Sequence, residues 1–241
     1  MVDPHCLYRK LGLRIMESIA VLVSGGMDSS ILTVDLARQG YRVFPVYLQH
    51  GLIWEPVELD HLERFLSAVN DQRIESLTVL KLPVDDMYNN HWSVTGKGVP
   101  DESTDDDAVY LPGRNLLLLA KMAVWCSLND VSKIAMAPLK GNPFSDNSDQ
   151  FYSSMQKVIS LALESHVDIV RPYSSMSKDQ VIVLGEGLPL ELTFSCIRPR
   201  DGIHCGRCNK CAERKSAYRV LVAEDSTPYF DQAVDEIESH V

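Results

Sequence analysis

The sequence predicts an α/β fold in which helices cover both faces of a doubly wound, Rossmann-like parallel sheet, followed by a C-terminal lobe rich in cysteine. Short β-rich runs alternate with helical stretches along most of the chain, which is typical of βαβ units. Four of the six cysteines lie together after residue 195. We therefore expect an α/β domain over residues 1–190, with a long insertion near 84–112, and a cysteine lobe with terminal helices over 191–241.

Composition and charge narrow the class of protein. The 241 residues are 45% hydrophobic and 23% charged, as in an ordinary soluble globular protein. No run of about 18 apolar residues and no secretory signal is present, so we expect a cytoplasmic protein without a membrane span. The net charge of -10 argues against stable nucleic-acid binding, because neutralising phosphates requires clustered lysine and arginine.

The elements of the first half follow from apolar periodicity and from glycine or proline at their ends. The spacing predicts strands over 18–24, 42–48 and 75–82, and helices over 28–40 and 56–69. A polar stretch of about thirty residues then reaches the next helix, and loops of this length are usually functional lids or disordered.

The second half continues the alternation. The pattern predicts helices over 114–128, 148–165 and 177–187 and a strand over 132–138. Ser177 and Gln180 have capping-box spacing at the start of the third of these helices. Thr227 and Pro228 would begin a final helix as its cap and first helical residue.

The stretch VLVSGGMDSS, residues 21–30, predicts an anion-binding turn. A strand, a Ser-Gly-Gly turn and a helix place backbone N–H groups at a helix N-terminus, which favours an anion. Gly25 and Gly26 permit positive φ, and the hydroxyl groups of the turn are further donors (Ser24, Ser29, Ser30). Asp28 would repel a bare phosphate and therefore indicates a hydrated Mg²⁺ beside a pyrophosphate. The alternative is a tight turn in which Asp28 is an ordinary first-turn carboxylate.

The cysteine lobe predicts a metal site. Its ligands would be the four cysteines spaced C-x8-C-x2-C-x2-C, namely Cys196, Cys205, Cys208 and Cys211, which suit a tetrahedral structural Zn²⁺. His204 could replace a ligand, although four cysteines make that unnecessary. An iron–sulfur cluster and a disulfide framework are the alternatives. Cys6 and Cys126 lie outside this spacing, and Cys126 reads as a core residue.

The lobe is also basic. Seven basic and two acidic residues lie between 198 and 219, and this positive charge can offset the negative charge of zinc-bound thiolates. The basic residues of the lobe therefore do not require an RNA partner.

Four stretches together resemble one family, the 7-cyano-7-deazaguanine synthases of queuosine biosynthesis, within the pyrophosphate-loop ATPases. The stretches are SGGMDSS (24–30), LPGRN (111–115), SMSKDQVIVLG (175–185) and TFSCIRPRDGIHCGRCNKCAERKSAY (193–218). The resemblance implies an adenine nucleotide alpha hydrolase-like fold and ATP-dependent conversion of 7-carboxy-7-deazaguanine and ammonia to the nitrile. The carboxylate and then the amide would be adenylated in turn. Members of the family are commonly dimers, so it also implies a homodimer.

The resemblance assigns roles to residues of this chain. The turn from Ser24 to Ser30, which includes Met27, would bind the pyrophosphate of ATP with Mg²⁺, and Asp28 would be the metal partner. Lys178, in the S-K position, would be a cation for the same phosphates, and its alternative is a solvated surface lysine. Arg114 would clamp phosphate or orient substrate, and its alternative is a structural arginine that binds backbone carbonyls.

The chain departs from the family pattern at two places. YLQHGLIWE (47–55) replaces YGQRH, and KGNPFSDNSDQF (140–151) replaces SGYPDCR without its Cys-Arg pair. Asp146 would accept from a guanine-like base or would be a capping aspartate. Trp92, after His91 in the insertion, would stack on a purine.

These departures leave two other functions open. One is a related ATP-pyrophosphatase with a different acid or a macromolecular acceptor, as in tRNA modification or thiolation. The other is an inactive nucleotide-binding paralogue, against which the intact SGGMDSS turn argues.

Overall fold

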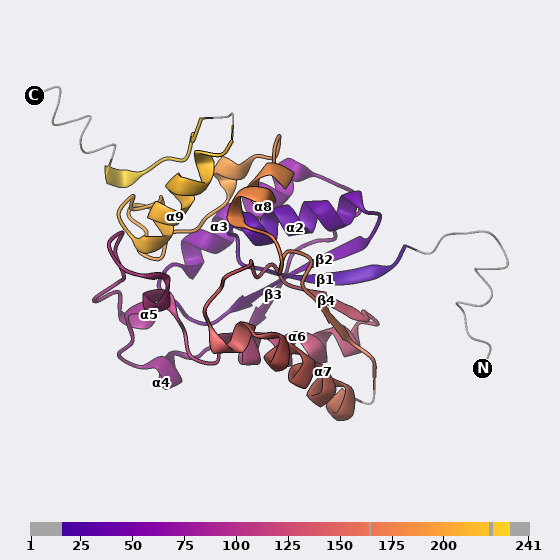
Figure 1. Ribbon diagram of the computed structural model, residues 1–241. Coiled ribbons are helices and arrows are strands. Elements are labelled where there is room, and N and C mark those ends of the chain that lie inside the picture. The colour runs from indigo at the N-terminus through magenta and orange to yellow at the C-terminus, as the bar shows by residue number, and fades with distance from the viewer. Residues whose placement is uncertain (1–15, 164, 222–223, 232–241) are drawn as a thin grey trace, which may run out of the picture.

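The computed structural model describes residues 16–163, 165–221 and 224–231, and Figure 1 shows them as a parallel sheet between helices. The sheet has five strands in the order β3-β2-β1-β4-β5, all parallel. The strands are β1 (Ser18–Val23), β2 (Arg42–Gln49), β3 (Thr78–Lys81), β4 (Lys133–Ala135) and β5 (Asp168–Val170). The predicted doubly wound fold is confirmed, and β5 is the strand that the sequence pattern did not reveal.

Helices cover both faces of the sheet. One face carries α2 (Met27–Arg38), α3 (Glu55–Val69) and α8 (Lys178–Leu184), and the other carries α6 (Arg114–Leu128) and α7 (Asp149–Leu163). Figure 1 shows α2 and α8 above the strands and α6 and α7 below them. Because both faces are covered, β1 reads as a continuous apolar run, buried from Ile19 to Val23. The two cores meet across this central strand.

Helix ends follow the predicted signals where the chain is described. α8 begins with the expected capping box: the Ser177 side chain accepts from the Gln180 N–H, and the Gln180 side chain accepts from the Ser177 N–H. Gly40, just after α2, has φ of 95°, which suits glycine. Thr227 and Pro228 are an exception: they were predicted as the cap and first residue of a final helix, but neither is helical, because Tyr229 after them pairs with His204 in a parallel bridge, and a helix starts only at Phe230. The residues after 231 and Cys6 lie outside the described residues.

The long insertion is folded against the cysteine segment. It contains α4 (Asp85–Tyr88), α5 (Trp92–Thr95) and the 3-10 turn η1 (Asp106–Val109), and its apolar residues pack with the cysteines in a third core cluster. Asp101 pairs with Cys208 in an antiparallel bridge, and the Asn209 N–H donates to the Pro100 carbonyl at 3.1 Å. The cysteine segment continues into α9 (Asn209–Tyr218), so insertion and cysteine lobe form one packed unit.

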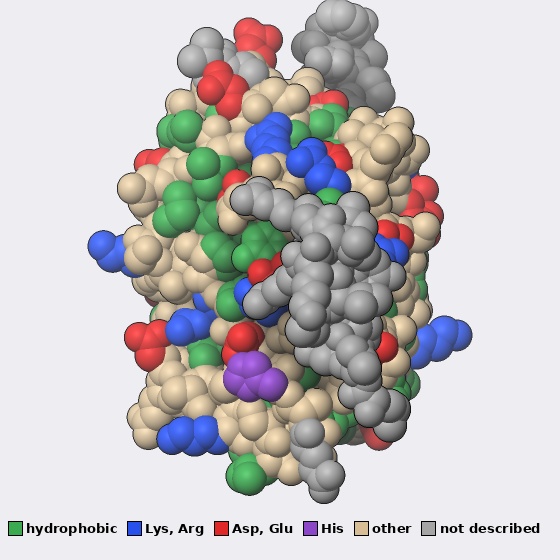
Figure 2. All heavy atoms as spheres, turned by 90° about the vertical axis from the view of Figure 1, so that its right-hand side faces the viewer, with side chains coloured by type: hydrophobic (Ala, Val, Ile, Leu, Met, Phe, Trp, Pro, Cys, Tyr) green, Lys and Arg blue, Asp and Glu red, His purple; other side chains and the backbone are tan. Residues whose placement is uncertain are grey.

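Two further 3-10 turns complete the described elements, η2 (Ser145–Asn147) and η3 (Leu190–Leu192). Within the described residues, no helix combines the length and the apolar character needed to cross a bilayer. Figure 2 shows the side of the molecule at the right of Figure 1, where acidic and basic side chains are interspersed. Neither sign of charge gathers into a patch on the visible part of that face.

Candidate functional site

The glycine turn lies where the direction of winding reverses. β1 pairs with β2 on one side and with β4 on the other. Helices α2 and α3, which follow β1 and β2, cover one face of the sheet, whereas α6 and α7, which precede and follow β4, cover the other. In sheets of this type, ligands bind at the carboxyl ends of the strands next to such a switch point. The turn Ser24-Gly25-Gly26 directly follows the carboxyl end of β1, so the predicted anion-binding turn is at the expected edge.

Only glycine suits position 25, both because of its backbone conformation and because a side chain would have no room there. Its φ is 71°, and a Cβ there would lie 3.0 Å from Glu58 Cγ and 3.1 Å from the Glu58 carbonyl oxygen. Its own carbonyl accepts from the Phe194 N–H at 2.8 Å, which ties the turn to the segment before Cys196. Gly25 therefore closes the turn against its neighbours.

The hydroxyl groups of the turn hold one another. Ser29 Oγ accepts from the Ser24 N–H at 3.1 Å and lies 3.2 Å from Ser24 Oγ. No described side chain caps the N-terminus of α2, whose cap residue is Gly26, so the first-turn N–H groups are left for a ligand. Met27 and Ser30 are buried, and Ser30 Oγ has no hydrogen-bond partner among the described residues.

Three cavities adjoin the turn, and Asp28 lines all of them. They measure about 210, 590 and 200 Å³. We call them together the Asp28 cleft. The first is also lined by Ser24, Gly26, Ser29 and Arg114, the second by residues 137–144 and α9, and the third by Trp54, Glu58, Arg114 and Lys178. The cleft therefore brings together the turn, both predicted cations and the start of the divergent segment 140–151.

Alternating charges run along one wall of the cleft. The Lys178 ammonium lies 2.8 Å from Asp28 and 3.3 Å from Glu213, and Glu213 in turn lies 2.6 Å from the Lys210 ammonium. Burial opposes the charge of Lys178, but the two carboxylates raise its pKa overall. Burial also opposes the charge of Glu213, yet the two lysines lower its pKa to about 2. Glu213 and Lys210 were not identified from sequence, because nothing local distinguishes them from solvated helix residues.

A buried acid lies behind the turn. The Tyr47 hydroxyl donates to Glu58 Oε2 at 2.6 Å, and burial raises the pKa of Glu58 to about 8. Arg114 is close enough to oppose this rise, and its buried Nε has no hydrogen-bond partner among the described residues. Sequence reasoning missed Glu58, although its place on the face of α3 that buries Leu62 and Phe65 was a signal.

The first divergent segment forms the turn between β2 and α3. The Glu55 carboxylate accepts from the N–H groups of His50, Gly51 and Leu52 at 2.8 to 3.2 Å. Burial raises the pKa of Glu55, but the His50 side chain, whose Nδ1 lies 3.3 Å from Glu55 Oε1, and these backbone N–H groups lower it overall. The segment therefore has its own internal anchor.

Two further predicted substrate groups have partners within the protein. Asp146 Oδ2 accepts from the Asn115 N–H at 3.0 Å in the first turn of α6, which is the capping role that the sequence left open. Trp92 stacks on Trp54 with ring centroids 5.7 Å apart. His91 caps α5, where its side chain accepts from the Ser93 N–H.

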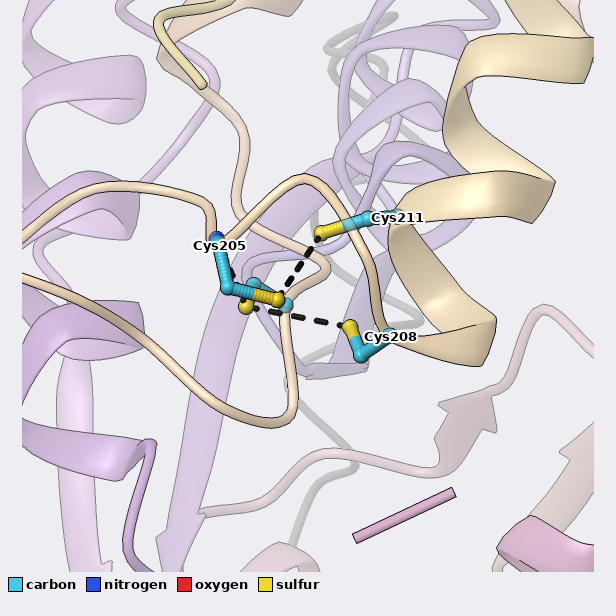
Figure 3. A group of neighbouring side chains, drawn as sticks. Cys205, Cys208 and Cys211 are labelled. Carbon is cyan, nitrogen blue, oxygen red and sulfur yellow. Dashed lines mark hydrogen bonds between the residues drawn. The ribbon is translucent and has the colours of Figure 1, made fainter. Parts of the chain in front are cut away.

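The four cysteines form a compact buried cluster. Their Sγ atoms lie within 4.8 Å of one another, and Figure 3 shows the sulfurs of Cys205, Cys208 and Cys211 turned toward a common centre. The Cys205–Cys211 and Cys208–Cys196 Sγ separations are 3.9 and 3.8 Å, too long for a disulfide. Tetrahedral Zn–S bonds of about 2.3 Å place sulfurs about 3.8 Å apart. The donor set and its spacing are compatible with one Zn²⁺.

The basic residues of the lobe have separate environments. Arg214 is fully buried in a polar network, and Lys215 Nζ donates to the Gly206 carbonyl at 2.9 Å between two of the cysteines. Arg198, Arg200 and Arg207 border a cavity of about 260 Å³ beside Cys205 and Cys208. Some of the basic residues of the lobe, but not all of them, therefore lie beside the cysteine cluster.

The chain is similar to proteins of known family and of known fold. The family model described as queuosine biosynthesis protein QueC matches residues 18–222. The 7-cyano-7-deazaguanine synthases of Methanothermobacter thermautotrophicus and Methanocaldococcus jannaschii are each 27% identical, covering 89% and 90% of this chain and 99% and 100% of theirs. A solved 4-thiouridine synthetase–RNA complex with bound ATP aligns with TM-score 0.50 at 14% identity, over 93% of this chain and 50% of that one. That last likeness shows the fold alone.

Proposed function

The chain belongs to the family of queuosine biosynthesis protein QueC, and on that premise we propose that it converts 7-carboxy-7-deazaguanine, ammonia and ATP to 7-cyano-7-deazaguanine. The curated relatives at 27% identity carry the name of that synthase. The observation that carries the chemical part is the Asp28 cleft, where an uncapped helix N-terminus, Lys178 and Arg114 meet at the switch point of the sheet. The enzyme would be an ATP-dependent C–N ligase.

The proposed reaction has two adenylations. In the first, a substrate carboxylate oxygen bonds to the α-phosphorus of ATP, the α–β bond breaks and pyrophosphate leaves. Ammonia then attacks the acyl carbon, AMP leaves and the amide forms with loss of a proton. In the second, the amide oxygen bonds to the α-phosphorus of another ATP, and pyrophosphate and one nitrogen-bound proton leave. Loss of AMP and the remaining nitrogen-bound proton then gives the nitrile.

The residues of the cleft suit the charge that develops in these steps. The N–H groups at the start of α2, with Lys178 and Arg114, would stabilise negative charge on the leaving pyrophosphate. Asp28 and Lys178 are paired at 2.8 Å. When ATP binds, Asp28 would bind Mg²⁺ and Lys178 would bind the phosphates. Mg²⁺ supplies neutralisation of the phosphate charge. A Zn²⁺ on the four cysteines would be structural, because all four positions around it would be occupied by protein ligands.

Segment 140–144, which lines the 590 Å³ cavity, would face the deazaguanine ring. Asp146 is held at α6, so base recognition by that carboxylate is not part of the proposal. We also propose that free ammonia is the nitrogen source and that the protein is a homodimer, which mass photometry would test.

The decisive experiment identifies the product and measures whether its new nitrogen comes from ammonium. The protein is incubated with ATP, Mg²⁺, ¹⁵N-ammonium and 7-carboxy-7-deazaguanine, and products are identified by mass spectrometry. The expected result is a ¹⁵N-labelled nitrile with AMP, absent when ATP is omitted. AMP formed only with another acid or with tRNA would replace the substrate assignment, and no AMP with any acceptor would favour an inactive paralogue.

A further inference from the structure

Helix α9 carries two charged side chains from the cysteine lobe into the Asp28 cleft. The helix begins directly after Cys208, its cap residue, and Cys211 lies in its first turn. Lys210 and Glu213 are one turn apart, with Lys210 Nζ 2.6 Å from Glu213 Oε2. The cysteine cluster therefore determines where this charged face of α9 lies.

Glu213 separates two ammonium groups. Its Oε1 lies 3.3 Å from Lys178 Nζ and its Oε2 lies 2.6 Å from Lys210 Nζ, so one carboxylate holds both lysines. Only 22% of the Lys178 side-chain surface and 29% of the Lys210 side-chain surface is accessible to solvent. Asp28 contacts Lys178 on its other side at 2.8 Å, so two carboxylates and two lysines alternate and their charges balance. Lys210 is the end of this series and contacts one carboxylate, Glu213, among the described residues, so it is the lysine that can turn to an added anion at least cost.

The position of Lys210 relates it to the anion-binding turn. Lys178, Lys210 and Glu213 line both the 590 and the 200 Å³ cavities together with Asp28. The 200 Å³ cavity also reaches Ser24 and Gly26 of the turn. A ligand whose phosphates rest on the turn would extend past Lys178 toward Lys210.

We propose that Lys210 is a second phosphate-binding cation of the Asp28 cleft, supplied by the cysteine lobe, and that it binds the polyphosphate of ATP together with Lys178. The inference rests on the proposed function in taking that polyphosphate to be ATP. Lysine suits this role as a point charge on a flexible stem, which can turn from Glu213 to a phosphate without moving α9. It also gives the cysteine cluster a part in nucleotide binding through the helix that it anchors.

The test measures nucleotide binding apart from turnover. Titration calorimetry with Mg²⁺ and α,β-methylene-ATP, which cannot be cleaved between the α and β phosphates, compares the wild type with Lys210→Met, Lys210→Arg and the control Lys157→Met. Lys157 is exposed on α7. We expect Lys210→Met to weaken binding about tenfold, and Lys210→Arg to stay within about threefold of the wild type. In steady-state assays the KM for ATP should rise more than kcat falls.

Zinc content and thermal midpoint report whether the variants are folded. Equal binding by Lys210→Met and the wild type would overturn this inference alone, as would an equal loss in Lys157→Met. Failure of the wild type to bind the analogue would overturn the proposed function and this inference with it.

Discussion

Lys178 donates to both carboxylate oxygens of Asp28, at 2.8 Å each, across 150 positions of the chain. The pair joins the first turn of α2 to the first residue of α8. The capping box of Ser177 and Gln180 fixes the start of α8 and thereby the direction in which Lys178 leaves it. Two of the residues that the family resemblance assigned to ATP chemistry are therefore direct neighbours.

This pair gives the first prediction. Asp28→Asn keeps the shape of the side chain and removes its charge, and Lys178→Met does the same for the cation. We expect each to lower the rate of AMP formation about 100-fold or more, because each removes a preorganised charge from the reacting phosphates. Asp60→Asn is the matched control, since Asp60 is an exposed residue of α3 with 67% of its side-chain surface accessible. Unchanged turnover in Asp28→Asn would remove that residue from the mechanism.

The second prediction concerns the metal. We expect about one Zn²⁺ per chain in the wild type, and loss of most of it with a clear fall in thermal midpoint in Cys208→Ser. Cys126→Ala is the control, because Cys126 is also buried but lies in α6, outside the cluster. Elemental analysis by mass spectrometry and a melting curve measure both effects. Iron in place of zinc, or full zinc retention by Cys208→Ser, would contradict the assignment.

Much of the fold was accessible from the sequence because periodic apolar runs and end signals agree in the first half. The pattern predicted the strand over 42–48 and the helix over 114–128 to within a residue. β5 was missed because it has only three residues, all half-buried, at the edge of the sheet. Too few residues remain there to show a period.

The site divides in the same way. The turn 24–30 and the four cysteines have local spacing that carries chemistry, so the sequence reveals them. Glu58 and Glu213 acquire their shifted pKa values from burial and from tertiary contacts, with Tyr47 in one case and Lys178 in the other. Trp92, which was expected to stack on a purine, stacks on Trp54, a partner that only the tertiary fold brings to it.

Arg214 gives the third prediction. It is fully buried and donates to Thr193 Oγ1 at 2.8 Å, to the Leu190 carbonyl at 2.7 Å and to Thr227 Oγ1 at 3.0 Å, so it ties α9 to η3 and to the chain after residue 224. Arg214→Met would leave these acceptors unpaired and should cost about 3 kcal/mol of unfolding free energy. Arg214→Lys should recover only part, because lysine lacks the planar fork. Urea unfolding measures the loss, with the exposed Arg219→Met expected to match the wild type within about 0.5 kcal/mol.

Glu58 gives the last prediction, a pH dependence of stability. Burial raises its pKa from 4.5 to about 8 in the folded protein, so the folded state holds a proton that the unfolded state releases between these values. Its contribution to stability is therefore fully present below pH 4.5 and is lost as the pH rises through 8.

Glu58→Gln keeps an acceptor for the Tyr47 hydroxyl and cannot ionise, so the variant should lack this loss. Between pH 5 and 9 the advantage of the variant over the wild type should grow by up to about 4 kcal/mol. Urea unfolding at several pH values measures it, and Glu63→Gln, at an exposed position of the same helix, should follow the wild-type curve. Parallel curves for Glu58→Gln and the wild type would mean that Glu58 is ionised in the folded protein at neutral pH, with Arg114 as the group available to offset its charge.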